Sequence, residues 1–416
     1  MPDSWQFSDG IDVSDASVNA DATGPAGARS YDVVIAGAGL VGLALAPMLA
    51  RAGLTVALVD RNPIAAAAPD PATWDMRVYA ISPGSAAFLR AVGAWQALPC
   101  DRITAIESMH VEGDAGAALS FSAYEMGERA LAWIVEERAL RATLLPVVRA
   151  AGVDVHGGVS FEALSFLPEA GTLRLAGGAS IAGRLIVGAD GGQSWVRNAA
   201  GIVAEPRAYG QTAVVANFAC ELPHHGRALQ WFRADGGVLA WLPLPGRRIS
   251  IVWSAPEAQA AELQALAPAA LADRVALAGG HALGTLECIT AAGGFPLRFL
   301  RLPTSVALRL ALVGDAAHGV HPLAGQGVNL GFGDAQALAS VLADRGPVAD
   351  PGAPILLDRY ARRRAEPVLA MQAVTDGLAR LFGPPSPWLR TLRNAGMSAV
   401  DRLPLIKRAL AQPALR

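Results

Sequence analysis

Residues 31–61 read YDVVIAGAGLVGLALAPMLARAGLTVALVDR, and this stretch decides the fold. The apolar run 33–36 predicts a buried strand, and the glycine-rich GAGLVG follows it directly. An apolar helix is expected over 43–52, and a second buried strand over 55–59. Strand, glycine-rich turn, helix and strand in this order predict the first βαβ unit of a doubly wound α/β sheet.

The glycines of this turn have the G-x-G-x-x-G spacing, at Gly37, Gly39 and Gly42. The first permits a tight turn, the second lets the backbone approach a pyrophosphate, and the third lets the helix pack closely on the strand. Asp60 stands at the end of the second strand, where a carboxylate can bind both hydroxyls of an adenosine ribose. The stretch therefore predicts a dinucleotide site. The acid favours FAD or NAD over NADP, because it would repel a 2′-phosphate.

Two later strands also end at an acid. The run 181–189, IAGRLIVGA, is followed by Asp190 and Gly191, and the run 310–313 is followed by Gly314 and Asp315. The carboxyl ends of strands in a doubly wound sheet face one crevice, so both acids are expected to point toward one extended ligand.

The second of these acids opens the densest glycine stretch, ALVGDAAHGVHPLAGQGVNLGFGDA at 311–335. A helix can begin near residue 326, and its first amides would then face whatever lies in the loop. Taken alone, the stretch could also be an ordinary strand-to-helix connection. His318 and His321 have no evident third ligand, so no metal site is predicted.

Residues 211–253 have a different pattern. Alternating stretches separated by Gly and Pro turns predict antiparallel strands inserted between parts of the nucleotide-binding fold. Such a sheet would form the wall of a pocket for an apolar or aromatic substrate. Its tryptophans, Trp231, Trp241 and Trp253, could line that pocket or simply fill the core.

Two arginines lie where a phosphate could be bound. Arg77 follows Asp75 in a loop that is expected to lead into a helix, and Arg138 lies at the start of the helix predicted within 133–144. For Arg77, a phosphate contact and a surface or capping role remain alternatives. Acids are expected at a helix start, so Arg138 is the residue of its cluster that suggests a functional role.

The last part of the chain is expected to be helical. A long helix is predicted over 355–382, and a basic amphipathic segment over 388–410. That segment could dock on the protein's own surface, on a partner, or on anionic lipid.

The composition narrows the class of protein. The 416 residues are 52% hydrophobic and 17% charged, and the net charge is −2, without a basic block typical of a nucleic-acid-binding protein. Three widely spaced cysteines fit a reducing compartment. Residues 1–30 predict a disordered extension without a secretory signal, and no apolar run spans a membrane. We therefore expect a cytoplasmic protein, either free or peripheral on the inner face of the membrane.

Together these motifs resemble the FAD-dependent aromatic hydroxylases of the para-hydroxybenzoate hydroxylase fold. Within them, GDAAHGVHPLAGQGVNLG at 314–331 is similar to the GDAAHxxHPxxGQGxNxG signature of the ubiquinone-biosynthesis hydroxylase family, with every fixed position filled. The segments DMRVYAIS at 75–82 and RYARRR at 359–364 also resemble that family. Gly236–Gly237 and Gly333 depart from it: members often carry Gly-Pro at the first place and a larger residue at the second.

The resemblance implies a role for each predicted cofactor residue. The first three glycines would hold the FAD pyrophosphate, Arg77 and Arg138 the phosphate or ribityl region, and Asp315 a ribityl hydroxyl. The loop at 325–329 would lie along the flavin ring. The full predicted set is Gly37, Gly39, Gly42, Asp60, Arg61, Arg77, Arg138, Asp190, Gly191, Asp315, Pro322, Gly325, Gln326, Gly327, Val328 and Asn329.

The resemblance also implies the activity. A transient NAD(P)H would reduce FAD near Asp190 and Gly191, and a flavin hydroperoxide would hydroxylate a polyprenylated phenol on the ubiquinone pathway. No catalytic base is identified. A hydroxylase of a small soluble aromatic, or a non-catalytic flavin-binding subunit, are the alternatives.

The expected architecture is a Rossmann-like FAD-binding domain with an inserted antiparallel β-sheet substrate domain and a C-terminal helical region. The FAD-binding domain would comprise 31–105, 130–205 and 295–345. The substrate domain would comprise 106–129 and 206–294, and the C-terminal helices 346–416.

Overall fold

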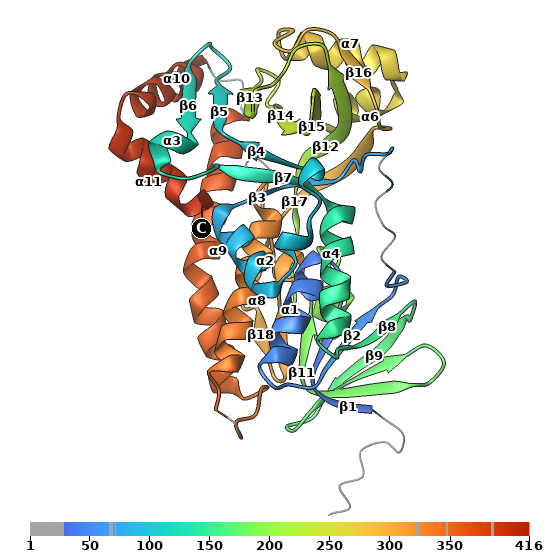
Figure 1. The fold of residues 1–416 in the computed structure, drawn as a ribbon. Helices are drawn as coiled ribbons and strands as arrows, with labels where there is room; N and C mark the ends of the chain where they lie inside the picture. The colour runs from blue at the N-terminus through green and yellow to red at the C-terminus, as the bar shows by residue number, and fades with distance from the viewer. Residues whose placement is uncertain are drawn as a thin grey trace, which may run out of the picture.

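The computed structural model describes residues 29–65, 70, 72–321, 325–346, 348–383 and 387–415. The predicted extension at 1–30 lies almost wholly outside the described residues. The fold has two large sheets, a small sheet between them, and helices that cover both (Figure 1). This α/β architecture confirms the predicted fold class, including a helical C-terminal region.

The first sheet is mainly parallel and contains the glycine-rich turn. Its strand order is β18-β19-β11-β1-β2-β8, and β9 and β10 extend it through β11. The strands are β1 (Arg29–Ala36), β2 (Val56–Asp60), β8 (Asp154–Gly157), β9 (Phe161–Phe166), β10 (Gly171–Leu175), β11 (Ser180–Gly188), β18 (Val306–Ala307) and β19 (Leu310–Leu312). Strand β1 lies between β2 and β11 and is parallel to both, as expected for a dinucleotide-binding unit.

Both faces of this sheet are covered, which explains the continuous apolar run in β1. Val33 and Ile35 pack on the side of the helices, while Val34 and Ala36 pack on the opposite side, and all four are fully buried. The covering helices are α1 (Leu40–Arg51), α2 (Pro83–Val92), α4 (Glu137–Ala150) and α8 (Gly327–Ala343), with the short α5 (Trp195–Ala199) near β9.

The second sheet is mainly antiparallel and has the order β20-β17-β12-β15-β14-β13-β5-β6, with β16 paired to β12. Its strands are β5 (Ser108–Glu112), β6 (Ala118–Ser122), β12 (Arg207–Cys220), β13 (Arg227–Phe232), β14 (Val238–Leu244), β15 (Arg248–Pro256), β16 (Leu286–Cys288), β17 (Gly293–Arg301) and β20 (His318–Gly319). Strands β12 to β15 match the alternating pattern predicted over 211–253.

The tryptophans of this sheet belong to its core. Trp241 and Trp253 are each 1% exposed and pack with residues of α6 (Glu257–Ala265) and α7 (Pro268–Ala278). The two side chains therefore lie on the face of the second sheet that α6 and α7 cover, which is turned away from the first sheet. Of the two roles that the sequence left open for them, the structure favours the core.

A small third sheet, β3-β7-β4, lies between the two large ones (Figure 1). It contains β3 (Val78–Ile81), β4 (Ile103–Ile106) and β7 (Ala132–Glu136). The sequence predicted a loop leading into a helix over 75–85. Helix α2 does begin there, at Pro83, but the strand β3 before it was missed. The four-residue strand forms by pairing with β7 more than fifty residues away, which local periodicity cannot reveal.

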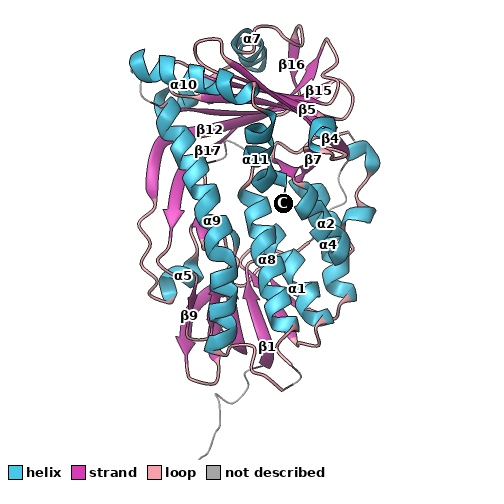
Figure 2. Cartoon of the chain, turned by 90° about the vertical axis from the view of Figure 1, so that its left-hand side faces the viewer, coloured by secondary structure: helices cyan, strands magenta, loops and turns pink. Residues whose placement is uncertain are grey.

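The chain ends in three helices: α9 (Pro354–Phe382), α10 (Pro387–Asp401) and α11 (Pro404–Leu415). Helix α9 runs from the first sheet to the second (Figure 2), and α10 packs beside β6 near the short α3 (Ala123–Met126). The basic segment predicted at 388–410 is thus two helices. Among the described residues, no helix has the length and apolar character needed to cross a membrane.

An ion cluster docks α10 on the turn between β5 and β6. Asp114 accepts hydrogen bonds from Arg393 and Asn394, and its side chain and that of Arg393 are almost fully buried. Burial disfavours the charge on Asp114, but the hydrogen bonds from Arg393 and Asn394 outweigh burial and lower its pKa. The predicted basic segment therefore docks, at least in part, on the protein's own surface.

Replacing Arg393 by leucine should destabilise the protein by about 3 kcal/mol, because Asp114 would keep its burial and lose its closest cation. Denaturant unfolding measures the loss, and hydrogen exchange should show faster exchange in α10. Arg402→Leu, at an exposed arginine just beyond α10, is the control. Equal stability of the two variants would contradict this account.

Candidate functional site

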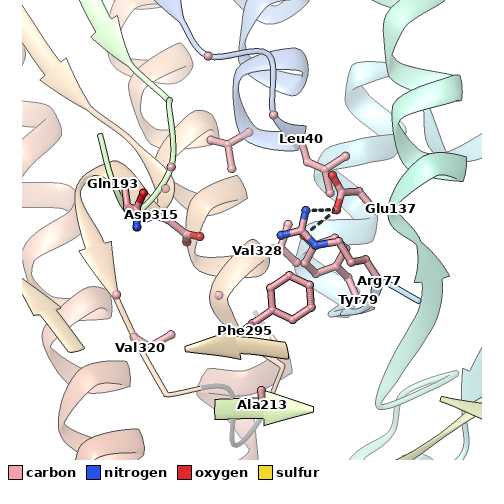
Figure 3. Close-up of a pocket in the computed structure, with 18 of the residues that line it drawn as sticks. Leu40, Arg77, Tyr79, Glu137, Gln193, Ala213, Phe295, Asp315, Val320 and Val328 are labelled. Atoms are coloured by element: carbon pink, nitrogen blue, oxygen red, sulfur yellow. Dashed lines mark hydrogen bonds and ion pairs between the residues drawn. The ribbon is translucent and has the colours of Figure 1, made fainter. Parts of the chain in front are cut away.

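A cavity of about 880 Å³ lies between the first sheet and the second. On one side it is lined by the glycine-rich turn after β1 and by the ends of β2, β11 and β19. On the other side it is lined by β12, β14, β15 and β17. Figure 3 shows Asp315 and Val328 on the first side, and Ala213 and Phe295 on the second. The cavity is continuous from the turn to the antiparallel sheet.

The three glycines of the turn are required for three different reasons. Gly37 has φ of +117°, a conformation that favours glycine, and a Cβ there would lie 2.3 Å from the Ala189 carbonyl oxygen. A Cβ on Gly42 would lie 2.0 Å from the Gly37 carbonyl oxygen, so α1 can pack closely on the turn only with glycine at this position. A Cβ on Gly39 would meet no protein atom within 4 Å and would extend into open space. Gly37 and Gly39 line the cavity.

Asp60 fixes the shape of this turn. Its carboxylate accepts hydrogen bonds from the amides of Ala38, at 2.6 Å, and Asn62, at 2.7 Å. Asp60 and Arg61 both line the cavity, as does Asn62. The predicted ribose-binding acid is therefore positioned by the backbone next to the glycine-rich turn.

Asp190 and Asp315, the acids after β11 and β19, both line the cavity, but they are oriented differently. The Asp190 carboxylate accepts hydrogen bonds from the amides of Trp195 and Val196, so it caps the start of α5. Gly191 lines the cavity beside it. The expectation that both carboxylates would point toward one ligand is therefore matched by Asp315 alone (Figure 3).

Asp315 lies deep in the cavity. Its side chain is exposed to the cavity, and protein atoms surround the cavity on the sides near it. This enclosure raises the pKa of Asp315, against the opposing effect of His318 and Arg77. A partly dehydrated carboxylate in this position is suited to accept hydrogen bonds from ligand hydroxyl groups.

Arg77 projects into the middle of the cavity. Its guanidinium forms an ion pair with Glu137, at 3.0 Å, and lies over the Phe295 ring, 4.9 Å from its centroid (Figure 3). Tyr79 lies beside this pair, and burial raises its pKa above the usual range. Glu137 and Tyr79 are lining residues that sequence reasoning missed. Glu137 belongs to no recognisable motif, and Tyr79 lies within the segment 75–82 without being singled out by it.

Arg138 does not line the cavity. Its guanidinium donates hydrogen bonds to Thr73 and forms an ion pair with Glu136, at 3.2 Å. One turn later on α4, Arg141 lines the cavity instead and donates to the Ala38 carbonyl at 2.8 Å. Helix α4 therefore does present an arginine to the cavity, but it is Arg141 and not Arg138, the arginine that the sequence suggested.

The glycine-rich loop before α8 is divided between lining and support. Gly325, Gly327 and Val328 line the cavity, and Pro322 lies outside the described residues. Gln326 and Asn329 are buried and make structural contacts.

Asn329 donates to the Ala80 carbonyl at 2.8 Å and accepts from the Ser82 amide at 3.0 Å. It also donates to the Gln326 side chain. These bonds connect the start of α8 to the end of β3.

Asp334 on α8 lies at the centre of a buried ion cluster. It is 1% exposed, and its carboxylate contacts His318 Nε2 at 2.6 Å and Arg364 Nε at 2.6 Å. It also accepts from the Gly314 amide at 2.8 Å. Burial opposes its charge, but His318, Arg364 and the amide outweigh burial and lower the pKa of Asp334. The cluster connects α8 and α9 to the turn that contains Asp315.

The departure at Gly333 fits this cluster. A Cβ on Gly333 would lie 3.0 Å from Arg364 Nη1, so glycine leaves room for the guanidinium. Asp334 was missed in the sequence because an acid within a helix has no distinctive pattern. Its spacing of 16 residues from His318 gave no signal either.

Comparisons with known proteins agree with this geometry. Residues 30–375 match the model of a family described as an FAD binding domain. Ubiquinone hydroxylase UbiL of Rhodospirillum rubrum is 34% identical over 95% of this chain and 92% of its own length. The 3-demethoxyubiquinol 3-hydroxylase of Escherichia coli is 35% identical over 92% of this chain and 98% of its own length.

The chain belongs to the FAD binding domain family and, within it, to the ubiquinone-biosynthesis hydroxylases. Among solved structures, PqsL of Pseudomonas aeruginosa in complex with 2-aminobenzoylacetate has a TM-score of 0.74 at 26% identity. The superposition covers 89% of this chain and 99% of the PqsL chain. These findings confirm the family inferred from the motifs, the FAD cofactor, and an enzyme of the FAD-dependent monooxygenase class.

Gly39→Ala should weaken FAD binding without destabilising the FAD-free protein, because the added methyl group would meet only the space where the cofactor approaches. Gly42→Ala should lower both the FAD affinity and the stability of the FAD-free protein, since its methyl group would collide with the Gly37 carbonyl. FAD titration and thermal unfolding of the FAD-free variants separate the two effects. Unchanged FAD affinity in Gly39→Ala would contradict the placement of the pyrophosphate.

Asp334→Asn should reduce stability by about 3 kcal/mol and weaken FAD retention, because His318 and Arg364 lose their shared buried partner. Asp350→Asn, which removes an acid that pairs with two arginines and does not line the cavity, should leave FAD affinity unchanged.

The lowered pKa of Asp334 also predicts a pH dependence. The stabilisation by Asp334 should be complete at pH values above the pKa of an ordinary carboxyl group, which is about 4. It should be lost as the pH falls through the lower pKa that Asp334 has in the folded protein. Acid titration of bound FAD fluorescence checks this. Two results would contradict this role of the cluster: release of FAD from wild type already above about pH 4, or the same pH dependence of FAD release in Asp334→Asn as in wild type.

Proposed function

We propose that the protein hydroxylates the aromatic ring of a polyprenylated phenol in ubiquinone biosynthesis, with FAD as bound cofactor and NAD(P)H as a transient co-substrate. The observation that carries the proposal is the continuous cavity between the glycine-rich turn and the apolar sheet face. It offers a nucleotide-binding end and a substrate-binding end. The predicted division into an FAD-binding domain, an inserted substrate domain and C-terminal helices is part of this proposal.

The nucleotide end of the cavity fits FAD residue by residue. The backbone at Gly37 and Gly39 and the first amides of α1 would bind the pyrophosphate. Asp60 would bind the adenosine ribose, and Asp315 would accept from a ribityl hydroxyl. Arg77 would contact the phosphate or ribityl region after releasing Glu137.

The loop before α8 fits the flavin ring. Gly327 and Val328 are the first residues of α8 and line the cavity, so their amides would lie near the ring oxygens and stabilise negative charge there. Bound and reduced, FAD would supply the activation of O₂ for ring hydroxylation. Gly191 lies on the cavity wall nearby, where we place the brief contact of NAD(P)H.

The substrate end is mainly apolar. Val215, Val252 and Leu297 line it from three strands of the antiparallel sheet. A wall of this kind binds an aromatic ring and keeps water away from the reacting atoms.

The C-terminal helices offer a surface for peripheral contact. Trp388, Leu392, Leu403 and Ile406 on and between α10 and α11 are 45–67% exposed, whereas Arg393 is turned inward to Asp114. We propose that this apolar surface supports contact with the membrane or with a biosynthetic complex.

Purified protein should be yellow and release FAD, and a farnesylated phenol in detergent should stimulate its NAD(P)H oxidation. The product should gain one oxygen atom from ¹⁸O₂, as measured by mass spectrometry. Bound FAD without stimulation would instead favour a non-catalytic subunit. Turnover of water-soluble phenols alone would favour the small-aromatic alternative.

A further inference from the structure

Among the described residues of β12, β14 and β15 that line the cavity, Ser250 is the one with a polar side chain. Directly opposed residues of antiparallel strands lie on the same face, so β12 and β15 present Val215 with Val252, and Asn217 with Ser250, to one side. Val215, Val252 and Ser250 line the cavity. Asn217 projects from the same face toward the loop before Arg77, because its side chain donates to the Asp75 carbonyl at 2.8 Å.

Both polar side chains of this pair carry a buried atom without a partner. Asn217 and Ser250 are 0% exposed, and neither Asn217 Oδ1 nor Ser250 Oγ has a hydrogen-bond partner among the described residues. Buried oxygen atoms without partners cost folding free energy. Because Ser250 lines the cavity and Asn217 lies directly opposite it on the neighbouring strand, the pair points to a ligand that reaches both.

The chemistry of the missing partner follows from the two atoms. The Asp75 carbonyl can only accept, so it must receive the Asn217 amide hydrogen, and Oδ1 remains a free acceptor. The Ser250 hydroxyl can both donate and accept. A ligand hydroxyl matches both, because it donates to Asn217 Oδ1 and accepts from Ser250. A methoxy oxygen has no hydrogen to give and leaves Asn217 unpaired.

We propose that Asn217 and Ser250 bind the phenolic hydroxyl of the substrate and so determine both the orientation of its ring and the preference for a free phenol. The cross-strand position places the two side-chain Cβ atoms about 5 Å apart, which suits two contacts to one oxygen. The inference rests on the proposed function, because it assigns the polar contact of that substrate site.

Ser250→Ala is the decisive variant, since removing a hydroxyl that has no hydrogen-bond partner within the described part of the chain should leave folding unchanged. Ser250→Thr keeps the hydroxyl. Ser254→Ala is the matched control, because Ser254 lies four residues along the same strand, is 3% exposed and does not line the cavity. Each FAD-loaded protein is titrated with a farnesylated phenol and with its methyl ether, and the flavin absorbance reports binding.

Wild type and Ser254→Ala should bind the phenol roughly tenfold more tightly than the ether, as expected for one lost hydrogen bond. Ser250→Ala should lose most of that preference, and Ser250→Thr should retain it. Equal binding of both probes by wild type, together with phenol-stimulated NAD(P)H oxidation, would overturn this assignment and leave the proposed function standing. Equal affinity of Ser250→Ala and wild type for the phenol would likewise overturn the assignment and leave the proposed function standing. A wild type that responds to neither probe would overturn both.

Discussion

One buried carboxylate, Asp334, determines the geometry of the cavity wall where we propose that the flavin ring binds. It lies on α8 and contacts His318, the Gly314 amide and Arg364 of α9. Isolated, it would be too costly to bury, and with these three partners it is held in its charged form. Because Gly314 precedes Asp315 directly, and α8 begins beside the cavity, the cluster sets the relative position of Asp315 and the start of α8.

The long helix α9 extends this constraint to the second sheet. Tyr360 donates to the Leu312 carbonyl at 2.8 Å, and one turn later Arg364 reaches Asp334. Further along, Gln372 donates to the Leu300 carbonyl of β17 at 2.7 Å. One helix thus contacts the parallel sheet, the ion cluster and the antiparallel sheet (Figure 2). The two ends of the cavity are therefore held in a fixed position relative to each other, as the proposed reaction between cofactor and substrate requires.

Much of this could be predicted from the sequence where the constraint is local. Gly37, Gly39 and Gly42 each exclude a side chain within one turn, so their spacing reveals the βαβ unit. Long-range partners left no such pattern. The pairing of β3 with β7, the choice of Arg141 over Arg138, and the capping of α5 by Asp190 depend on packing between segments far apart in the chain. The cross-strand pair of Asn217 and Ser250 required the sheet register.

The central claim is that three segments far apart in the sequence form one FAD site. Hydrogen exchange of the backbone, with and without FAD, tests it most directly. The account predicts that FAD slows exchange together at 37–42, 314–316 and 327–330, the segments at the turn, the acid and the start of α8. Protection confined to the glycine-rich turn, with no change at the other two segments, would contradict it.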